Sequence, residues 1–358
     1  MAKMLMKGNE AIAEAAIRAG CRFFFGYPIT PQNEIPEYMA RRMPQVEGTF
    51  VQAESEVAAI NMVYGAAGAG ARVMTSSSSP GVSLKMEGIS YIAGARLPCV
   101  VVNIVRGGPG LGGIQASQSD YLQATKGGGH GDYHMVVLAP SNLQEAVELT
   151  QEAFDIADQY RVPVMLLGDG MLGQMMEPLD MEGYQPRSQQ SKTWATTGMD
   201  GKRKPNIINS LFLDPQKLED HNHGLQQTYQ VIGQNEIKVA CDGVDDADII
   251  VTAYGTTARI VEAARALAQA DGVKIGVIRP ITLWPFPVAA FKQAAQSNAK
   301  AILSVELSEG QMVEDVKLAV GERKPVYFYG RSGGMMPTPK QIYDEIQQVL
   351  EGRRSEWR

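Results

Sequence analysis

Short apolar runs alternate with amphipathic stretches through the first half of the chain. The run Cys99–Val105 is apolar at nearly every position, which is typical of a parallel strand buried on both faces. Further strands are predicted at 23–26, on the approach to Gln52, from 73, at 135–138 and at 162–167. Helices are predicted between them at 9–20, 34–43, from 56 to about 70, and 142–160. This order of elements predicts an α/β domain with a parallel sheet over residues 1–176.

The same alternation returns at Asp248 after a long polar interval. Strands are predicted at 248–253, 274–278, 301–305 and 326–329, and helices at 258–270, 288–296, 311–320 and 339–350. These elements predict a smaller parallel α/β domain over residues 244–358. The interval 177–243 is rich in Gln, Asn, Lys and Asp and has little periodicity. We expect an extended connection there, packed on the sheet or on a partner.

Composition and charge exclude several classes of protein. The chain has 358 residues, a formal net charge of -6 and no dense basic patch, which argues against a nucleic-acid partner. No apolar run reaches the roughly 18 residues that a membrane helix needs. Three scattered cysteines, Cys21, Cys99 and Cys241, lack the spacing of a disulfide framework or an iron-sulfur site. His221 and His223 form an H-x-H pattern, but no cysteine or carboxylate cluster supplies a full coordination set for a metal ion. We therefore expect a cytoplasmic protein that has no metal site and no contact with a membrane.

Two acids open a helix made of small residues. Glu54 and Glu56 stand where the strand near Gln52 passes into this helix, and no basic residue lies between Gln52 and Gly70. A carboxyl group placed against tightly packed backbone is desolvated, which raises its pKa and lets it share a proton with a bound heteroaromatic ring. Both acids would also favour the positive end of the helix dipole. The local sequence leaves these two interpretations open.

Polar residues follow other predicted strands, at the edge where open α/β sheets bind ligands. Thr30 lies between Pro28 and Pro31 in a stiff turn, and Arg106 ends the run 99–105, where it could hold a carboxylate through paired hydrogen bonds. Alternatively, Thr30 signals the start of the next helix and Arg106 is a surface residue. The five hydroxyl residues at 75–79 precede Pro-Gly and suit either a polar pocket or a helix cap.

Three further patterns are weaker. Gly108–Gly113 fits G-x-G-x-x-G, but Pro109 interrupts the turn, so a mobile covering loop is favoured over a dinucleotide site. The tripeptide 168–170 resembles the start of a magnesium-diphosphate motif, but the asparagine pair that should follow is missing. Asp169 is therefore interpreted as a turn residue. The stretch 255–257 suits either anion binding or helix capping.

Seven separated motifs together resemble the alpha subunit of multisubunit 2-oxoacid:ferredoxin oxidoreductases over nearly the whole chain. They are, in order, Gly26–Pro31, Gln52–Ala67, Thr75–Glu87, Val105–Gly110, Gln118–Asp120, Arg279–Pro287 and Val305–Gly310. The resemblance implies a pyrimidine-binding domain for thiamine diphosphate at 1–176 and a transketolase C-terminal-type α/β domain at 244–358. It also implies that the cofactor lies between this chain and a beta subunit, which supplies the Mg²⁺-diphosphate site.

The resemblance gives roles to particular residues. Glu56 matches the family's glutamate that contacts the pyrimidine ring and thereby promotes loss of the thiazolium proton. Thr30 and Arg106 would hold the carboxylate of the substrate. Further contacts with the cofactor would come from Tyr27, Pro28, Ser79 and Gly81.

The resemblance also implies partners and a substrate. The family passes electrons through iron-sulfur clusters to ferredoxin and the acyl group to coenzyme A. Because this chain lacks ligands for iron-sulfur clusters, gamma and ferredoxin-like delta subunits would carry the clusters. The motifs Gly26–Glu34 and Gly330–Pro339 are most similar to the branched-chain, 2-oxoisovalerate type. Two alternatives stay open. One is an enzyme for 2-oxoglutarate, in which Lys85 or Lys126 could bind the second carboxylate of the substrate. The other is a non-catalytic scaffold subunit of the same fold.

Overall fold

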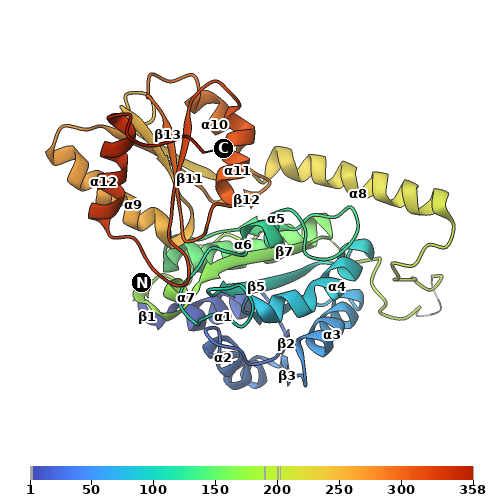
Figure 1. Ribbon diagram of the computed structural model, residues 1–358. Coiled ribbons are helices and arrows are strands. Elements are labelled where there is room, and N and C mark those ends of the chain that lie inside the picture. The colour runs from blue at the N-terminus through green and yellow to red at the C-terminus, as the bar shows by residue number, and fades with distance from the viewer. Residues whose placement is uncertain (1–2, 189–190, 200, 202, 358) are drawn as a thin grey trace.

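Two α/β units lie one above the other in the computed structural model, which describes residues 3–188, 191–199, 201 and 203–357 (Figure 1). The first sheet has the strand order β12-β6-β7-β5-β4-β2-β3, and only β12 runs antiparallel to its neighbour among these described strands. Its strands are β2 Phe23–Gly26, β3 Thr49–Gln52, β4 Val73–Ser77, β5 Cys99–Val105, β6 Val136–Leu138, β7 Pro163–Asp169 and β12 Thr282–Trp284.

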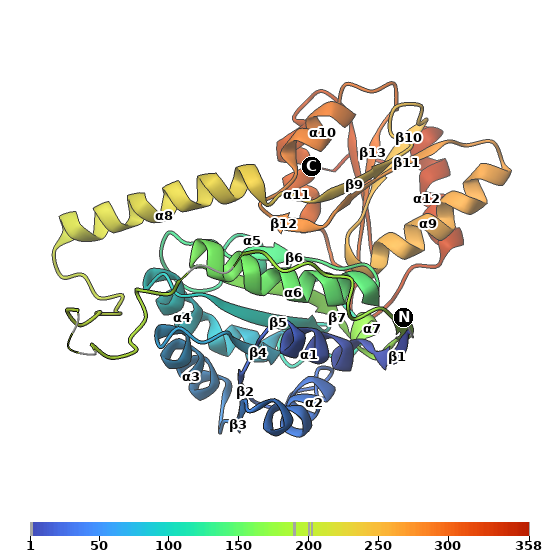
Figure 2. The same cartoon turned by 180° about the vertical axis from the view of Figure 1, so that it is seen from behind.

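Helices cover both faces of the first sheet, as expected for parallel strands. One face packs on α3 (Glu56–Gly68) and α4 (Pro80–Gly94), and the other on α1 (Gly8–Arg18), α2 (Glu34–Arg42) and α6 (Leu143–Tyr160) (Figures 1 and 2). Alternate residues of β5 divide between the two cores. Shorter elements complete the unit: β1 Met4–Lys7, the 3-10 helix Met43–Val46, α5 Tyr121–Thr125, α7 Gly170–Gln174 and β8 Met176–Leu179.

The second sheet has the strand order β14-β13-β10-β11-β9, in which β9 is the antiparallel strand. The strands are β9 Val239–Asp242, β10 Ile249–Thr252, β11 Ile275–Pro280, β13 Ile302–Glu306 and β14 Val326–Gly330. The helices are α9 Gly255–Ala270, α10 Val288–Ala294, α11 Met312–Val320 and α12 Pro339–Leu350. Helices α9 and α12 pack on one face, and α10 and α11 on the other.

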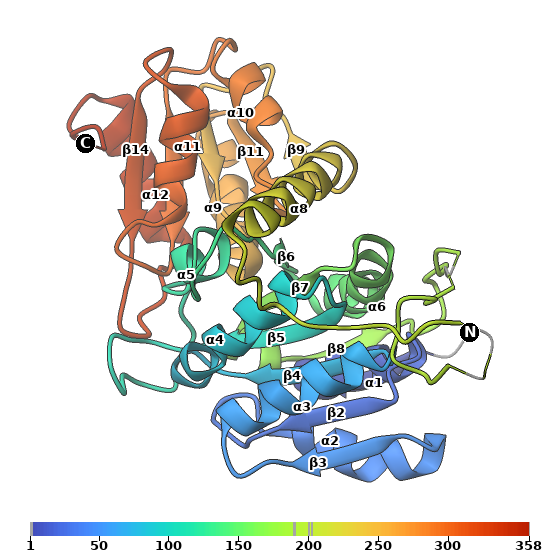
Figure 3. The same ribbon diagram turned by 90° about the vertical axis from the view of Figure 1, so that its right-hand side faces the viewer.

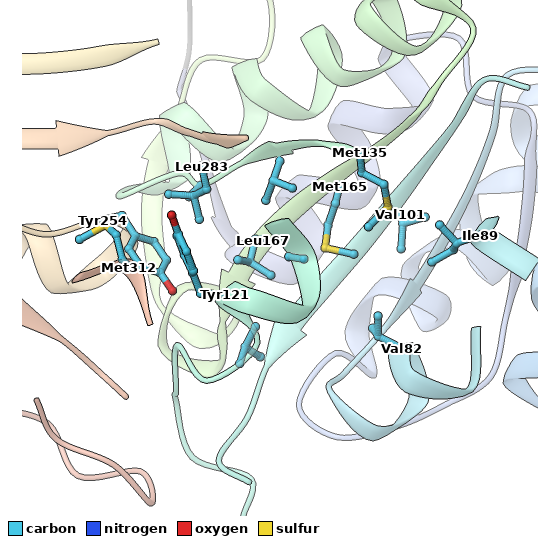
Figure 4. Packing of buried hydrophobic residues seen from close by; sticks show 14 of the residues in the cluster. Val82, Ile89, Val101, Tyr121, Met135, Met165, Leu167, Tyr254, Leu283 and Met312 are labelled. Atoms are coloured by element: carbon cyan, nitrogen blue, oxygen red, sulfur yellow. The ribbon is translucent and has the colours of Figure 1, made fainter. Parts of the chain in front are cut away.

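The two units share one hydrophobic core, which fixes their relative position. Tyr121 of the first unit packs against Tyr254 of the second, with ring centroids 5.7 Å apart. Figure 4 shows this pair together with Met312 and Leu283, next to Leu167 of the first sheet. Because apolar burial is shared across the boundary, separating the units would expose part of this core.

Buried polar contacts reinforce the same boundary. The side-chain oxygen of Gln118 accepts hydrogen bonds from Thr257 Oγ1 and from the backbone of Leu307, both at 2.9 Å, and its Nε2 donates to the carbonyl of Tyr254 at 2.8 Å. Asp169 accepts from the hydroxyl of Thr256. The hydroxyls of the stretch 255–257 therefore lie at the junction between the two units. This role differs from both the anion binding and the helix capping that the sequence suggests.

The interval 177–243 differs from the extended connection that the sequence predicts. It contains β8, the 21-residue helix α8 (Pro215–Asn235) and β9. Only Leu225, Tyr229 and Ile232 of α8 are buried, which explains the weak apolar period. Strand β12, from the second half of the chain, pairs with β6 and so belongs to the first sheet. In the described part of the chain, no helix is long and apolar enough to cross a membrane.

Candidate active site

Glu56 is buried at the carboxyl edge of the first sheet. Strand β3 ends at Gln52, and α3 begins at Glu56 after Ser55, whose hydroxyl caps the helix by accepting from the backbone of Ala58 at 3.2 Å. The Glu56 side chain is only 6% exposed, whereas Glu54 is exposed. The structure thus separates two acids that the local sequence treats alike, although Glu56 also occupies the position that favours the helix dipole.

The carboxyl group of Glu56 lies against the first turn of α4. A Cβ atom added at Gly81 would be 2.5 Å from Glu56 Oε1 and closer still to Ser77 Oγ. Real Cβ atoms do not approach oxygen atoms so closely, so glycine is required at this position. Gly88, two turns along the same helix, makes similar room for Ile60 of α3. The two glycines let α3 and α4 pack closely. This packing places the carboxyl group of Glu56 against the amino-terminal end of α4.

The run of hydroxyl residues at the end of β4 divides into two pairs and a turn. Thr75 and Ser76 bond inside the protein: Lys85 Nζ donates to Thr75 Oγ1 at 2.7 Å and to the carbonyl of Ser76 at 2.9 Å. The hydroxyls of Ser77 and Ser78 are buried, and neither has a hydrogen-bond partner among the described residues. An unpaired buried hydroxyl is costly, so these two suit a bound polar group.

Neither lysine considered for a second substrate carboxylate lines an open cavity beside Arg106. Lys85 is fully buried, and this burial lowers the pKa of its ammonium to about 7, while the negative charge of Glu56 acts in the opposite direction. Lys126 forms an ion pair with Asp315 at 2.5 Å. The structure therefore places both lysines in contacts within the chain.

Arg106 and Thr30 lie together after the ends of β5 and β2. Arg106 is 7% exposed; its guanidinium donates to the carbonyl of Thr30 at 3.0 Å and of Leu111 at 3.1 Å, and its buried Nε has no partner among the described residues. Thr30 Oγ1 accepts from Asn33 Nδ2 at 3.2 Å. Asn33, not Thr30, precedes α2, so the helix-start interpretation does not account for Thr30.

Tyr27 and Pro28 leave β2 at the same edge and are both exposed. The carbonyl of Tyr27 accepts from Gln32 Nε2 at 3.2 Å. Gln32 is completely buried and also accepts from the hydroxyl of Ser76 at 2.5 Å, so it ties this turn to the end of β4. The side-chain amide of the buried Gln32 therefore anchors the exposed turn to the core.

A buried network that the sequence did not predict connects Ser79 to Asp120. Asn103 of β5 is fully buried; its Oδ1 accepts from the backbone of Ser79 at 3.2 Å, and its Nδ2 donates to Asp120 Oδ2 at 2.9 Å. Ser79 has a φ of +22°, an unusual conformation for a residue with a side chain, and its Oγ accepts from the backbone of Arg106 at 3.0 Å. The one available signal was a lone asparagine within an apolar strand. Burial raises the pKa of Asp120.

A cavity of about 660 Å³ opens between the two units. Its walls come from both of them: Ser79, Pro80, Ser83, Arg106, Gly107, Gly108, Pro109, Gly110, Ser117, Ser119, Asp120, Ser308, Glu309, Gln311, Ser332 and Gly333. Of the predicted site residues, Arg106 and Ser79 line this cavity. Thr30, Glu56, Gly81, Tyr27 and Pro28 lie along the same sheet edge but outside its wall.

Both carboxylate oxygens of Asp169 accept hydrogen bonds within the chain. One carboxylate oxygen caps α7 by accepting from the backbone of Met171 and Leu172, at 2.9 and 3.0 Å, and the other accepts from Thr256. No cluster of three or more His, Cys, Asp or Glu side chains that could hold a metal ion occurs among the described residues. His221 instead lies 2.7 Å from the carbonyl of Gly94 through its Nε2.

Comparison with known proteins identifies the family. Residues 14–235 match the family model described as pyruvate flavodoxin/ferredoxin oxidoreductase, thiamine diP-binding, and residues 247–342 match pyruvate:ferredoxin oxidoreductase core domain II. The ketoisovalerate oxidoreductase subunit VorB of Methanothermobacter marburgensis is 48% identical over 349 residues, which cover 98% of each chain. The chain belongs to the 2-oxoacid:ferredoxin oxidoreductase family. The resemblance predicted from the seven motifs is therefore confirmed.

Three further comparisons have lower sequence identity. The 2-oxoglutarate synthase subunit KorA of the same organism is 36% identical, covering 95% of this chain and 97% of KorA. The solved 2-oxoglutarate:ferredoxin oxidoreductase from Magnetococcus marinus, with 2-oxoglutarate, coenzyme A and succinyl-CoA bound, superimposes with a TM-score of 0.87 at 28% identity. The match covers 97% of this oxidoreductase chain and 65% of that longer one. A split-gene transketolase shares the fold, with a TM-score of 0.61 at 15% identity. The predicted fold class is thus confirmed.

Proposed function

We propose that this chain is the pyrimidine-binding subunit of a thiamine diphosphate-dependent, coenzyme A-acylating 2-oxoisovalerate:ferredoxin oxidoreductase. The observation that carries the proposal is the 48% identity, over 98% of both chains, with a ketoisovalerate oxidoreductase subunit. The site supports it because a buried acid, two unpaired hydroxyls and an arginine all lie at the carboxyl edge of the parallel strands of the first sheet.

The residues present fit the pyrimidine half of the cofactor. Glu56 would accept or share the proton at a ring nitrogen, and Ser77 and Ser78 have hydroxyls free for the polar edge of the ring. The backbone at Gly81, Ser79, Tyr27 and Pro28 would line the ring, with the missing Cβ of Gly81 keeping the approach to Glu56 open. Bound thiamine diphosphate supplies the nucleophilic carbon and the electron sink for decarboxylation of a 2-oxo acid.

Arg106 and Thr30 would bind the carboxylate of the 2-oxo acid. The Arg106 guanidinium is held by two backbone carbonyls, and its unpaired Nε and its place in the cavity wall leave it able to pair with a small anion. Of the described residues that line the cavity, Arg106 is the only basic one. This single cation favours a substrate with one carboxylate over 2-oxoglutarate, which has two.

The remainder of the reaction requires other subunits. Because both oxygens of Asp169 are used within the fold, we assign the Mg²⁺-diphosphate site to a beta subunit. That subunit would cover the exposed apolar residues Val57 and Met62 of α3 and Leu84 of α4, beside Glu56. We assign the iron-sulfur clusters to gamma and ferredoxin-like delta subunits because two of the three cysteines are buried separately.

The test is turnover by the complete complex. The subunits are produced together, and coenzyme A-dependent reduction of ferredoxin or a viologen dye is measured with 2-oxoisovalerate, pyruvate and 2-oxoglutarate. We expect the highest kcat/KM with 2-oxoisovalerate. A higher value with 2-oxoglutarate would move the assignment to that substrate, and unchanged turnover after separate replacement of Thr30, Glu56 and Arg106 would indicate a scaffold subunit.

A further inference from the structure

The segment 206–213, just before α8, is an extended chain that belongs to no sheet. Its large apolar side chains alternate: Ile208 and Phe212 pack inward, whereas Ile207, Leu211 and Leu213 are 80%, 71% and 87% exposed. Among the described residues, no backbone group of 206–213 forms a hydrogen bond with another backbone group. The alternation is that of a β-strand with one packed face and no neighbouring strand, except that the backbone N–H of Leu211 donates to Asn209 Oδ1 at 2.8 Å.

The inward side chains fix the segment on the carboxyl ends of α3 and α4. Ile208 lies next to Gly68, the last residue of α3, and Ser210 lies next to Gly94, the last residue of α4; a Cβ added at these glycines would be 3.7 and 3.2 Å away, respectively. The ring of Phe212 packs on His221 of α8, with centroids 4.7 Å apart. The segment is therefore anchored, and its outward face is held open.

The first half of α8 extends this open surface. No residue between Pro215 and Gly224 is buried, and Leu218 is 40% exposed. Figures 1 and 2 show the helix projecting past the body of the molecule, with the segment 206–213 running back beneath it. In this half of the helix, His221 contacts the carbonyl of Gly94 and the ring of Phe212, and no side chain is buried.

The surface is continuous with the exposed faces of α3 and α4. Those helices begin at Glu56 and Pro80, beside the candidate site, and end at the two glycines that contact the segment. Between the two ends, Leu84 and Tyr91 of α4 are 54% and 38% exposed. Figure 3 views this side of the molecule, with α3 and α4 facing the viewer and α8 pointing forward. At 1.5 Å per residue, the helices span about 20 Å from site to segment.

We propose that residues 206–213, together with the first half of α8, form a docking arm for the same subunit that completes the site beside Glu56. The partner would present an open strand edge and an apolar groove, adding backbone hydrogen bonds to 206–213 and covering Ile207, Leu211 and Leu213. The inference rests on the proposed function, because a partner that covers α3 and α4 next to the site reaches the arm by continuing along the same face.

The test compares leucines of similar exposure in the full complex. Leu211→Asp/Leu213→Asp is produced with all partner subunits, beside Leu318→Asp on α11, a residue that is 79% exposed on the second unit. The dissociation constant for the beta subunit is measured by mass photometry over a dilution series. We expect it to rise about tenfold or more for the arm variant, as for other apolar anchors, and to stay unchanged for the control.

A second measurement needs no substitution. Amide hydrogen exchange of 206–213 is followed in the wild-type chain alone and in the complex. We expect fast exchange in the chain alone and protection in the complex. Unchanged exchange together with unchanged beta-subunit affinity would refute the docking arm. It would also be refuted if the arm variant weakened only the association between two copies of this chain. Activity of the wild-type complex is scored separately: a complex that docks through the arm but turns over no 2-oxo acid refutes the proposed function alone.

Discussion

At the residue scale, burial is what distinguishes Glu56 from Glu54. The two acids are separated by one residue, but the turn into α3 directs Glu56 onto the first turn of α4 and leaves Glu54 in solvent. A sequence pattern shows the acids and the small residues, but it does not show which acid points inward. The same limit applies to residues 75–79, where the sequence indicates a polar strand end without saying that Ser77 and Ser78 stay unpaired.

Glu56→Gln tests the acid directly. The amide keeps the size of the side chain but removes the carboxylate, so we expect kcat to fall by about 100-fold or more, in the range usual for loss of an acid-base group. Dye reduction by the assembled complex at saturating cofactor gives the measurement. Glu54→Gln is the matched control and should keep wild-type activity; equal activity of both variants would remove Glu56 from the site.

Lys85→Met tests the cost of a buried ammonium. Burial lowers the pKa of Lys85 from 10.5 to about 7, so between these values the unfolded chain binds more protons than the folded one. The lysine's contribution to the free energy of unfolding therefore rises with pH across that window and is constant below it. We expect urea unfolding to show that the free energy of unfolding of the wild type decreases relative to that of Lys85→Met as the pH falls from about 10 to about 7. A pH-independent difference would contradict this.

At the element scale, the site depends on the close approach of α3 and α4. Gly81 and Gly88 lie on one face of α4, and each makes room for a side chain of α3 or of the strand end beside it. Because these helices carry the acid and the helix end that faces it, their spacing sets the geometry of the pyrimidine site.

Gly81→Ala should therefore disturb the site and the packing together. The new methyl group would force Glu56 or Ser77 to move, and overpacking of this kind costs about 1–3 kcal/mol of unfolding free energy. We also expect weaker retention of thiamine diphosphate by the complex, measured by equilibrium dialysis. The control is Gly233→Ala in α8, where the added Cβ has no neighbour within 4 Å. That change should be neutral or stabilising by about 0.5–1 kcal/mol.

Most elements could be predicted from the sequence because their apolar residues follow a clear period. Strand β5 and helix α6 are examples, and their predicted positions agree with the structure to within two residues. Helix α8 was missed because only three of its residues meet the core. Strand β12 was missed for another reason: its three residues are stabilised by β6, which lies far away in the sequence. No local pattern reports a partner of that kind.

At the scale of the whole molecule, the cavity exists because two units are held in one relative position. Arg106 and Asp120 come from the first unit, and Gln311 and Ser332 come from the second. The sequence predicts both units and the loop that carries Arg106. It does not predict how the units meet, because buried side chains such as Gln118 decide that through contacts distant in the chain.

Gln118→Leu should loosen this junction. The substitution leaves the backbone groups of Leu307 and Tyr254 unpaired in a buried position, and each such group costs about 1–3 kcal/mol. We expect a loss of about 2–4 kcal/mol of unfolding free energy and a larger KM for the 2-oxo acid. Gln269→Leu, at an exposed position on α9, is the control for the change in polarity. Equal melting temperatures for the two variants would rule out this role for Gln118.

The pairing of β12 with β6 has a consequence for folding during synthesis. Strand β7 is complete at Asp169, but the strand that covers the outer edge of β6 begins only at Thr282. A ribosome adding about 5–20 residues per second needs several seconds or more to reach it. Throughout that interval the nascent first sheet presents an open edge, of the kind that other chains can pair with. Only β12, from the second half of the same polypeptide, covers this edge. Slower translation between the two strands should therefore lower the yield of folded protein.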